Sequence, residues 1–340
     1  MQAAQSQRAG EQPEEKVVGI PARQRADGGL GLKTSRATAR PIRVKVIQLE
    51  QNELPERISS ADRRRIWSTL VVPTTVMFPD QPGSGMTRRD GWKYAPLTRP
   101  NFDLVTDEIA RRIVEHANKW HIPTDIALES YPDPLLGEHA RKLTPAKYAE
   151  IGRRWLKDTD LLYVIGLHHG SVIPIAAAEP QLVRHIIDQH PDCSLTDGFT
   201  SDNHVSRAVQ VFGVKPGRIH FHGLAKPVQQ ALTTARGRTH LKNTGFVGKS
   251  HASFSDIEHA DWIDVDVDGL AEDDVKTAFV PGLVRTKSLL HAVRLHAPRV
   301  VTLTEYHPEN DYGNNELPVS LALHAFKAAY RRIRNDIQTK

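Results

Sequence analysis

Two short runs of the chain place metal-binding side chains at alternate positions. They are Asp188-Gln189-His190-Pro191-Asp192 and Asp264-Val265-Asp266-Val267-Asp268. On an extended strand, alternate side chains point the same way and lie about 6.6 Å apart, so they can converge on one small volume. Carboxylates this close repel one another, and their pKa values rise unless cations neutralise them. Oxygen-rich sites with one or two imidazoles suit Mn²⁺ better than soft metals, so the two runs predict a metal-dependent hydrolase.

Each run alone is weak evidence for a metal site. Surface loops contain Asp-x-His-x-Asp by chance, and Asp-x-Asp-x-Asp can be a solvated edge or the start of a calcium loop. A calcium loop needs a Glu at its twelfth position, which this chain lacks. Apolar residues precede both runs, at Leu182–Ile187 and Trp262–Ile263. Both segments therefore resemble buried strands with polar ends, where open α/β sheets bind ligands.

A third apolar segment ends in the same way. Residues Leu161–Gly166 form it, and His168 and His169 follow directly, before a helix expected from Val172. Either histidine alone would more often be a hydrogen-bonded structural residue than a ligand. Three strand ends with ligand-type side chains in one chain make coincidence much less plausible, so we expect them to meet at one edge of a sheet.

These motifs, in this order, resemble those of the ureohydrolases, the family of arginase, agmatinase and related guanidino hydrolases. The family has Gly-Gly-Asp-His-Ser, Asp-Ala-His-x-Asp, Ser-Gly-Asn-x-His-Gly, Ser-x-Asp-x-Asp-Gly and Glu-Val-Asn-Pro segments. The corresponding segments here are Gly166-Leu167-His168-His169, Asp188-Gln189-His190-Pro191-Asp192, Ser201-Asp202-Asn203-His204, Asp264-Val265-Asp266-Val267-Asp268-Gly269 and Glu305-Tyr306-His307-Pro308. The agreement in order and spacing covers about residues 160 to 310, whereas Arg88–Pro96 matches the family only faintly.

The resemblance implies two Mn²⁺ ions per chain and a set of ligands for each. One ion would be held by His169, Asp188, Asp192 and Asp266, and the other by Asp188, His190, Asp266 and Asp268. Asp264 stands where the family has Ser, so a register that uses Asp264 and Asp266 stays open. The resemblance also implies that His204 transfers protons and that Glu305 pairs with the guanidinium of the substrate.

The activity implied is hydrolysis of a guanidino group with release of urea. The substrate is expected to be a small guanidino compound or a peptide. Arginases of free arginine carry an Asp after a strand end that corresponds to Gly223–Val228, and this segment has no acid. A peptide arginase, which converts peptidyl arginine to ornithine, is therefore an alternative. Others are a deacetylase-like amide hydrolase with one metal and the pair His168-His169, and a catalytically inactive relative.

Alternating apolar strands and amphipathic helices predict an α/β protein, with a central parallel sheet between two helical layers. The expected strands are Ser68–Met77, Asp125–Leu128, Leu161–Gly166, Arg184–Asp188, Arg218–His222, Trp262–Asp268 and Val300–Tyr306. The expected helices are Leu104–Trp120, Pro145–Leu156, Asn203–Phe212, Thr286–His296 and Val319–Ile337. Residues 1–42 are predicted to be a disordered basic arm, and residues 43–340 a single arginase-like catalytic domain.

Composition narrows the setting of the protein. Cys193 is the only cysteine, so no intrachain disulfide can form. No apolar stretch reaches the length of a membrane span, and no signal or transit peptide is evident, so a cytoplasmic enzyme is expected. The net charge of +5 is modest, and without a recognised motif it does not indicate nucleic-acid binding. The family resemblance implies a homo-oligomer, either a trimer or a hexamer.

Overall fold

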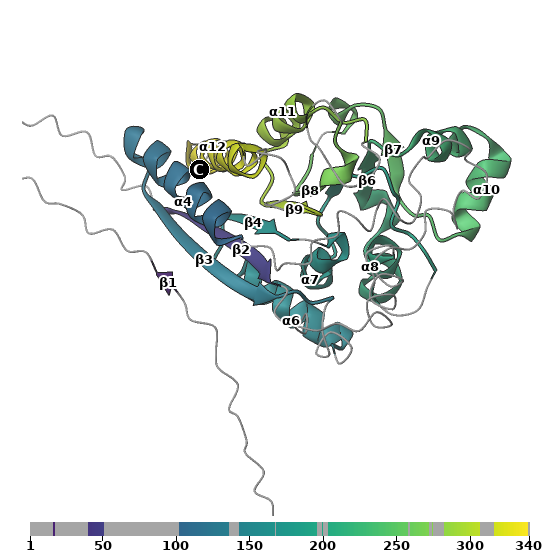
Figure 1. Ribbon diagram of the computed structural model, residues 1–340, viewed down its shortest axis with the longest axis horizontal. Helices are drawn as coiled ribbons and strands as arrows, with labels where there is room; N and C mark the ends of the chain where they lie inside the picture. Colours follow the sequence, from purple (N-terminus) through teal and green to yellow (C-terminus); the bar gives the residue numbers. More distant parts are fainter. Residues whose placement is uncertain are drawn as a thin grey trace, which may run out of the picture.

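The described strands of the protein form one sheet in a computed structural model of the chain (Figure 1). The structure describes residues 16–17, 40–50, 102–135, 143–166, 168–195, 199, 203–257, 259–271, 274, 282–306 and 316–338. The strands are β1 (Lys16–Val17), β2 (Ile42–Glu50), β3 (Thr124–Pro132), β4 (Leu161–Ile165), β5 (Arg184–Ile187), β6 (Ile219–His222), β7 (Lys249–His251), β8 (Trp262–Asp266) and β9 (Val300–Thr304).

The described helices follow the strands closely in the chain. The α-helices are α4 (Asp103–Lys119), α6 (Pro145–Leu156), α7 (Ile173–Ala178), α8 (His204–Phe212), α9 (Lys226–Thr233), α10 (Ala235–Asn243), α11 (Thr286–His296) and α12 (Glu316–Gln338). Short 3₁₀ helices are η1 (His169–Val172), η2 (Pro216–Arg218), η3 (Phe254–Asp256) and η4 (Val267–Gly269). Among the described residues, none of the helices combines the length and apolar character needed to cross a bilayer.

The sheet has the strand order β1-β3-β2-β4-β9-β8-β5-β6-β7. Strands β2 to β9 all run parallel to one another, and β1 pairs antiparallel with β3. Helices α4, α11 and α12 lie on one side of the sheet, whereas α6, α7 and α8 lie on the other (Figure 1). The predicted α/β architecture, with a parallel sheet between two helical layers, is confirmed.

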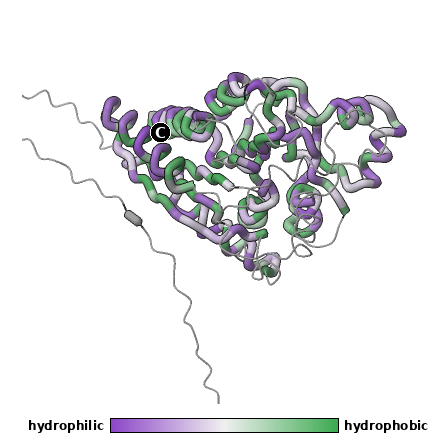
Figure 2. Tube along the Cα trace, viewed as in Figure 1, coloured by the Kyte–Doolittle hydropathy of each residue, from purple (hydrophilic) through white to green (hydrophobic). Residues whose placement is uncertain are grey.

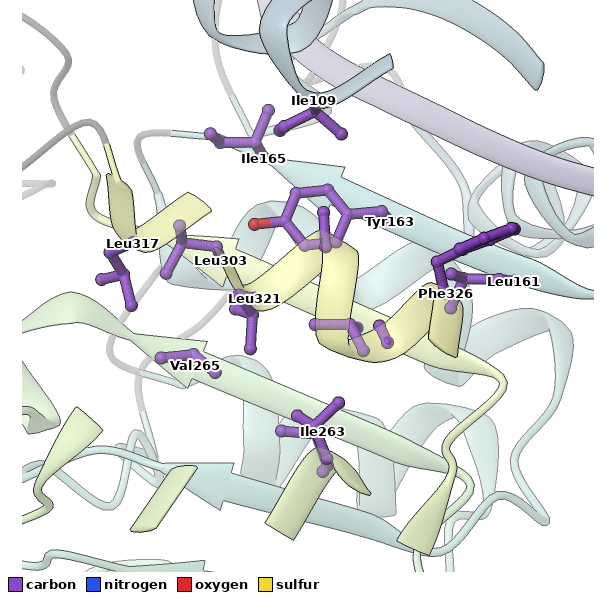
Figure 3. Close-up of a cluster of buried hydrophobic side chains, with 14 of the residues drawn as sticks. Ile109, Leu161, Tyr163, Ile165, Ile263, Val265, Leu303, Leu317, Leu321 and Phe326 are labelled. Carbon is purple, nitrogen blue, oxygen red and sulfur yellow. The ribbon is translucent and has the colours of Figure 1, made fainter. Parts of the chain in front are cut away.

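The strands are buried on both faces, which explains their nearly continuous apolar sequences. In β4, Leu161, Tyr163 and Ile165 pack into the core beneath α4 and α12, whereas Leu162 and Val164 pack into the core beneath α6 and α7. Figure 3 shows the first of these cores, where β4, β8 and β9 meet α12. Figure 2 shows the complementary pattern, with hydrophilic residues along the outer turns of α4 and α10.

Local signals in the sequence place several helix ends correctly. The Thr144 hydroxyl accepts a hydrogen bond from the Lys147 amide, and Pro145 occupies the first turn of α6. A hydroxyl at this position satisfies an otherwise unpaired amide, and proline there loses no hydrogen bond. Helix α8 ends at Gly213, which has φ = 73°, a conformation that glycine adopts without steric cost.

Strand β2 was not predicted, although it lies well inside the sheet between β3 and β4. Its basic residues, Arg43 and Lys45, directly follow the predicted basic arm of residues 1–42. In the structure both have partners: Arg43 Nε lies 3.6 Å from Asp160 Oδ2, and Lys45 Nζ lies 3.1 Å from Glu129 Oε1. The helix expected from Val172 is α7, which begins at Ile173. Helices α9 and α10 and strand β7 were not predicted, and the expected strand Ser68–Met77 lies outside the described residues.

Candidate metal centre

The predicted ligands gather at the carboxyl ends of four neighbouring strands. In sheet order these are β4, β9, β8 and β5. His169 begins η1 just after β4, Asp188 follows β5, Asp266 ends β8, and Asp268 lies in η4 directly after it. Glu305 follows β9. Parallel strands bring their carboxyl ends to one edge, so four segments, which extend from His169 to Glu305 along the chain, contribute to one site.

A first group of donor atoms surrounds His169, which is fully buried. Its Nδ1 atom lies 3.1 Å from Asp188 Oδ2, 2.9 Å from Asp192 Oδ2 and 3.4 Å from Asp266 Oδ2. These contacts do not have the geometry of hydrogen bonds. The buried Nδ1 atom therefore has no hydrogen-bond partner among the described residues. Ligands about 2.1 Å from a common ion lie about 3 Å from one another. The distance from His169 Nδ1 to each of the three oxygens is therefore compatible with ligands of one ion.

A second group surrounds His190, which is partly exposed. Its Nδ1 atom lies 3.0 Å from Asp268 Oδ2 and 3.7 Å from Asp188 Oδ1. Asp188 thus presents one oxygen to each histidine, as a carboxylate that bridges two ions would. The Oδ2 atom of Asp188 and the Oδ1 atom of Asp268 are buried and lack hydrogen bonds within the described part of the chain. Buried oxygens of this kind are costly unless a cation satisfies them.

Electrostatics also favours cations at this site. Burial and repulsion from Asp192 raise the pKa of Asp188 to about 7. Burial, with repulsion from Asp268 and Asp188, raises the pKa of Asp266 well above its ordinary value. The pKa of His190 rises to about 10, because the attraction of Asp268 outweighs the effect of burial. The cluster therefore holds more carboxylates than can ionise together, and divalent cations remove that conflict.

Asp264, the first acid of the triple run, has a different environment. Its carboxylate accepts hydrogen bonds from Arg184 and Thr302, and its Oδ2 atom lies 3.1 Å from His169 Nε2. The positive charge of Arg184 outweighs burial and holds the pKa of Asp264 below its ordinary value. Because protein groups already occupy its oxygens, the geometry favours Asp266 and Asp268 as ligands. Asp264 lies behind His169, on the side away from the other carboxylates.

His204 lies next to the Asp264 carboxylate rather than at an open surface. It is fully buried, and its ring centroid is 4.5 Å from that of His169. Its Nε2 atom lies 2.7 Å from Arg184 Nη2, and its Nδ1 atom lies 3.4 Å from Asp192 Oδ2. Sequence reasoning did not identify Arg184. The signal available was a charged residue opening an apolar strand, four positions before Asp188.

The adjacent histidines His168 and His169 do not act as a pair. The Nδ1 atom of His168 lies 2.8 Å from Asp133 Oδ2, and Asp133 also accepts a hydrogen bond from Ser171. His168 therefore joins the end of β3 to η1, whereas His169 faces the carboxylate cluster. A one-metal site built on this His pair would need both rings to face the same centre.

Glu305 adds a further carboxylate at the edge of the cluster. Its oxygen lies within 4.8 Å of oxygens of Asp266 and Asp268. Burial and the charges of both aspartates raise the pKa of Glu305 well above its ordinary value. Its backbone has φ = 56°, and Asp192 has φ = 44°, a conformation rare for residues other than glycine. Such local strain often accompanies functional sites.

Comparison with solved structures identifies the architecture. A hypothetical agmatinase from Burkholderia thailandensis matches at a TM-score of 0.51 and 14% identity, over 86% of this chain and 87% of that one. The formimidoylglutamase of Bacillus subtilis matches at a TM-score of 0.50 and 12% identity, over 76% of this chain and 99% of that one. The chain has the fold of the ureohydrolases. The family resemblance in the motifs is therefore confirmed at the level of the fold. No family model and no curated protein sequence matches the chain.

Proposed function

We propose that this ureohydrolase-fold protein is a hydrolase that uses two divalent cations to cleave a guanidino group and release urea. The observation that carries the proposal is the orientation of Asp188, whose two oxygens face two separate histidine-centred donor groups. His169, Asp188, Asp192 and Asp266 would hold one ion. Asp188, His190, Asp266 and Asp268 would hold the other. Mn²⁺ is the expected metal, because oxygen donors outnumber imidazoles.

Different residues of the chain would bind the metal ions and the substrate. Two bound cations would supply Lewis acidity and would lower the pKa of the attacking water. Glu305, beside Asp266 and Asp268, would bind the planar guanidinium through charge-assisted hydrogen bonds from its N–H groups. Glu305 would also keep the substrate carbon next to the metal centre, and such positioning lowers the barrier for hydrolysis of a resonance-stabilised group.

The loop after β6 indicates whether the substrate carries a free α-ammonium group. Leu224 in this loop is buried and Lys226 is exposed, and no residue of Gly223–Val228 is acidic. A free α-ammonium group would have no acid to pair with in this loop. We therefore favour guanidino compounds without that group over free arginine. A peptide arginase acting on peptidyl arginine is the second candidate, because a peptide bond also removes the ammonium charge.

A deacetylase-like amide hydrolase is less consistent with the geometry. That reading relied on His168 and His169 acting together, but His168 contacts Asp133 and Ser171. It also relied on one metal, whereas the donors form two groups that share Asp188. The expectations of a homo-oligomer, a trimer or hexamer, and of a cytoplasmic location stay predictions. Light scattering tests the first, and a monodisperse monomer would contradict it.

The deciding experiment measures metal content and urea release on the same preparation. The full chain is loaded with Mn²⁺, and its metal is counted by mass spectrometry. It is then supplied with arginine, agmatine, guanidino acids, an arginine-containing peptide and an acetylated lysine peptide. Two ions per chain with urea from at least one guanidino substrate supports the proposal. Two ions without urea from any substrate would contradict guanidino hydrolysis, and acetate release would favour the amide hydrolase.

A further inference from the structure

We propose that Arg184 and Asp264 are a positioning pair that fixes His169 and His204 in opposite tautomers, and that His204 positions Asp192 rather than carrying protons. The inference rests on the proposed function, because it takes His169 and Asp192 as metal ligands. It also assigns a role to Asp264, which distinguishes this chain from the motifs of the family. In those motifs a Ser stands at the position of Asp264.

The pair is built into the sheet. Arg184 opens β5 and Asp264 lies at the centre of β8, two neighbouring strands in which Ile186 pairs with Asp264. Arg184 is 3% exposed and Asp264 is 0% exposed. Arg184 Nε donates to Asp264 Oδ2 over 2.8 Å, and Nη2 donates to the same oxygen. The two charges balance one another, so the pair differs from the adjacent cluster of excess carboxylates.

Neighbouring side chains hold the pair from two sides. Trp262 Nε1 donates to Thr302 Oγ1 over 3.0 Å, and that hydroxyl in turn donates to Asp264 Oδ1. The Arg184 guanidinium also lies over the Trp262 ring, 4.2 Å from its centroid. The orientation of the carboxylate and of the guanidinium is therefore determined before any ligand binds. Such support is what positions metal ligands accurately.

Asp264 determines which nitrogen of His169 carries the proton. Its carboxylate accepts hydrogen bonds from Arg184 and Thr302, and Oδ2 lies 3.1 Å from His169 Nε2. A carboxylate that only accepts requires an N–H at Nε2. The lone pair of His169 then lies on Nδ1, which faces Asp188, Asp192 and Asp266. A carboxylate behind a ligating histidine in this way fixes its tautomer and increases its basicity.

Arg184 fixes His204 in the opposite tautomer, with the proton on Nδ1. Its Nη2 atom lies 2.7 Å from His204 Nε2, and a guanidinium can only donate. Nε2 must therefore accept, and the proton of the neutral ring lies on Nδ1, 3.4 Å from Asp192 Oδ2. In this arrangement both ring nitrogens of a fully buried His204 face protein groups. It therefore steadies Asp192, whose backbone has φ = 44°, and does not reach a leaving group.

The first arm of the test reads the tautomer of His204. The full chain is labelled with ¹⁵N at histidine and loaded with diamagnetic Zn²⁺, and long-range ¹H–¹⁵N spectra are recorded at neutral pH. The signal that disappears in His204→Gln identifies the ring. The proposal predicts that its proton is on Nδ1. A proton on Nε2, or on both nitrogens, would overturn it. A change confined to packing would not alter this signature.

The second arm measures Mn²⁺ affinity in the variant Arg184→Met/Asp264→Leu. Replacing both charges avoids leaving one of them buried and unpaired, which keeps the fold accessible. Loss of the support behind His169 is expected to weaken Mn²⁺ binding 10- to 100-fold. The matched control is Glu179→Gln/Arg299→Met, which removes the ion pair of 3.0 Å before the amino end of β9. Its affinity should stay that of the wild type.

The outcomes separate this inference from the proposed function. Affinity of the Arg184→Met/Asp264→Leu variant within twofold of the wild type would overturn the positioning role and leave the metal centre intact. An equal loss in the Glu179→Gln/Arg299→Met control would also overturn it, because the effect would then be general. Absence of Mn²⁺ uptake by the wild type would contradict the proposed function itself, and the positioning role would fall with it.

Discussion

Asp188 lies between two histidines, and each of its carboxylate oxygens faces one of them. Oδ2 is 3.1 Å from His169 Nδ1, and Oδ1 is 3.7 Å from His190 Nδ1. Because the residue follows β5 directly, its position is determined by the sheet rather than by a long loop. The two donor groups of the site share this single side chain, which makes it the most sensitive position of the proposed metal centre.

Replacing single carboxylates should therefore change the metal count in distinct ways. Asp188→Asn is expected to lose both ions, because it removes charge from both groups. Asp268→Ala is expected to lose only the ion beside His190, since its Oδ2 atom is 3.0 Å from that ring. Metal analysis after gel filtration in Mn²⁺ buffer measures the ratio. Two ions retained in Asp268→Ala would mean that the register of the three aspartates is shifted to Asp264 and Asp266.

Glu305→Gln should separate binding of the substrate from binding of metal. The side chain lies beside Asp266 and Asp268 but is assigned to the guanidinium. Loss of its charge is expected to abolish detectable urea release while two ions stay bound. Urea release and metal content are measured on the same sample. Near-normal turnover would remove the guanidinium role, and loss of an ion would make Glu305 a ligand.

Histidines of β5 and β6 form a cluster that should make the free energy of unfolding decrease at acidic pH. Burial and neighbouring rings lower the pKa of His185 to about 3 and of His222 to about 2, and burial with His251 lowers that of His220 to about 4. The rings contact one another, with His222 Nε2 3.2 Å from His185 Nδ1. Further titratable groups near the cluster are His251, His296, His259, Lys249 and Asp256.

The direction of the effect follows from proton uptake. The unfolded chain binds protons at these histidines near pH 6.5, whereas the folded chain resists them until about pH 4 or below. Their contribution to stability is therefore fully present above pH 6.5 and is lost as the pH falls toward the folded pKa values. Each such histidine adds a slope of at most about 1.4 kcal/mol per pH unit.

Urea unfolding of the metal-free chain at pH 7, 6 and 5 measures this slope. The variant His185→Leu/His222→Phe removes two of the titrating groups and retains an aromatic ring against Phe254, which stacks on His222 at 4.1 Å. Its free energy of unfolding should depend less steeply on pH than that of the wild type. The carboxylate cluster is unchanged in both proteins, so the difference between slopes isolates the histidines. Equal slopes would contradict the prediction.

The sequence predicts where the central strands begin, because each apolar run starts abruptly. Leu161, Trp262 and Val300 each open a strand at the predicted residue. The same strands end one or two residues before the predicted ends, because the residues that carry the site already belong to loops or 3₁₀ turns. Strand β2 was missed because Arg43 and Lys45 lie in a basic segment, and their partners Asp160 and Glu129 are more than 80 positions away. Local patterns contain no information about such pairs, which only the folded sheet brings together.

The candidate site shows the same division. Alternation along β8 predicts that Asp264 and Asp266 point to the same face of the sheet. In the structure both point away from the core that contains Ile263 and Val265. Alternation alone does not distinguish a residue that would bind metal from one that positions a metal ligand. That distinction depends on Arg184, which lies on another strand and neutralises only Asp264. The function of His204 was inferred from its motif, whereas its contacts depend on where α8 begins relative to β5.

Gly269 offers a test of how closely the loops of the site are packed. A Cβ atom at this position would lie 2.6 Å from the amide nitrogen of Asp188 and 2.7 Å from its Cα atom. Both are backbone atoms, so the strand end that carries Asp188 must move in Gly269→Ala. We expect loss of Mn²⁺ from both groups, with a folded sheet by circular dichroism. The control is Gly217→Ala, since a Cβ there meets nothing within 4 Å. That variant should bind two ions. Full metal content in Gly269→Ala would show that Asp188 tolerates displacement, which contradicts its proposed role as the ligand shared by both ions.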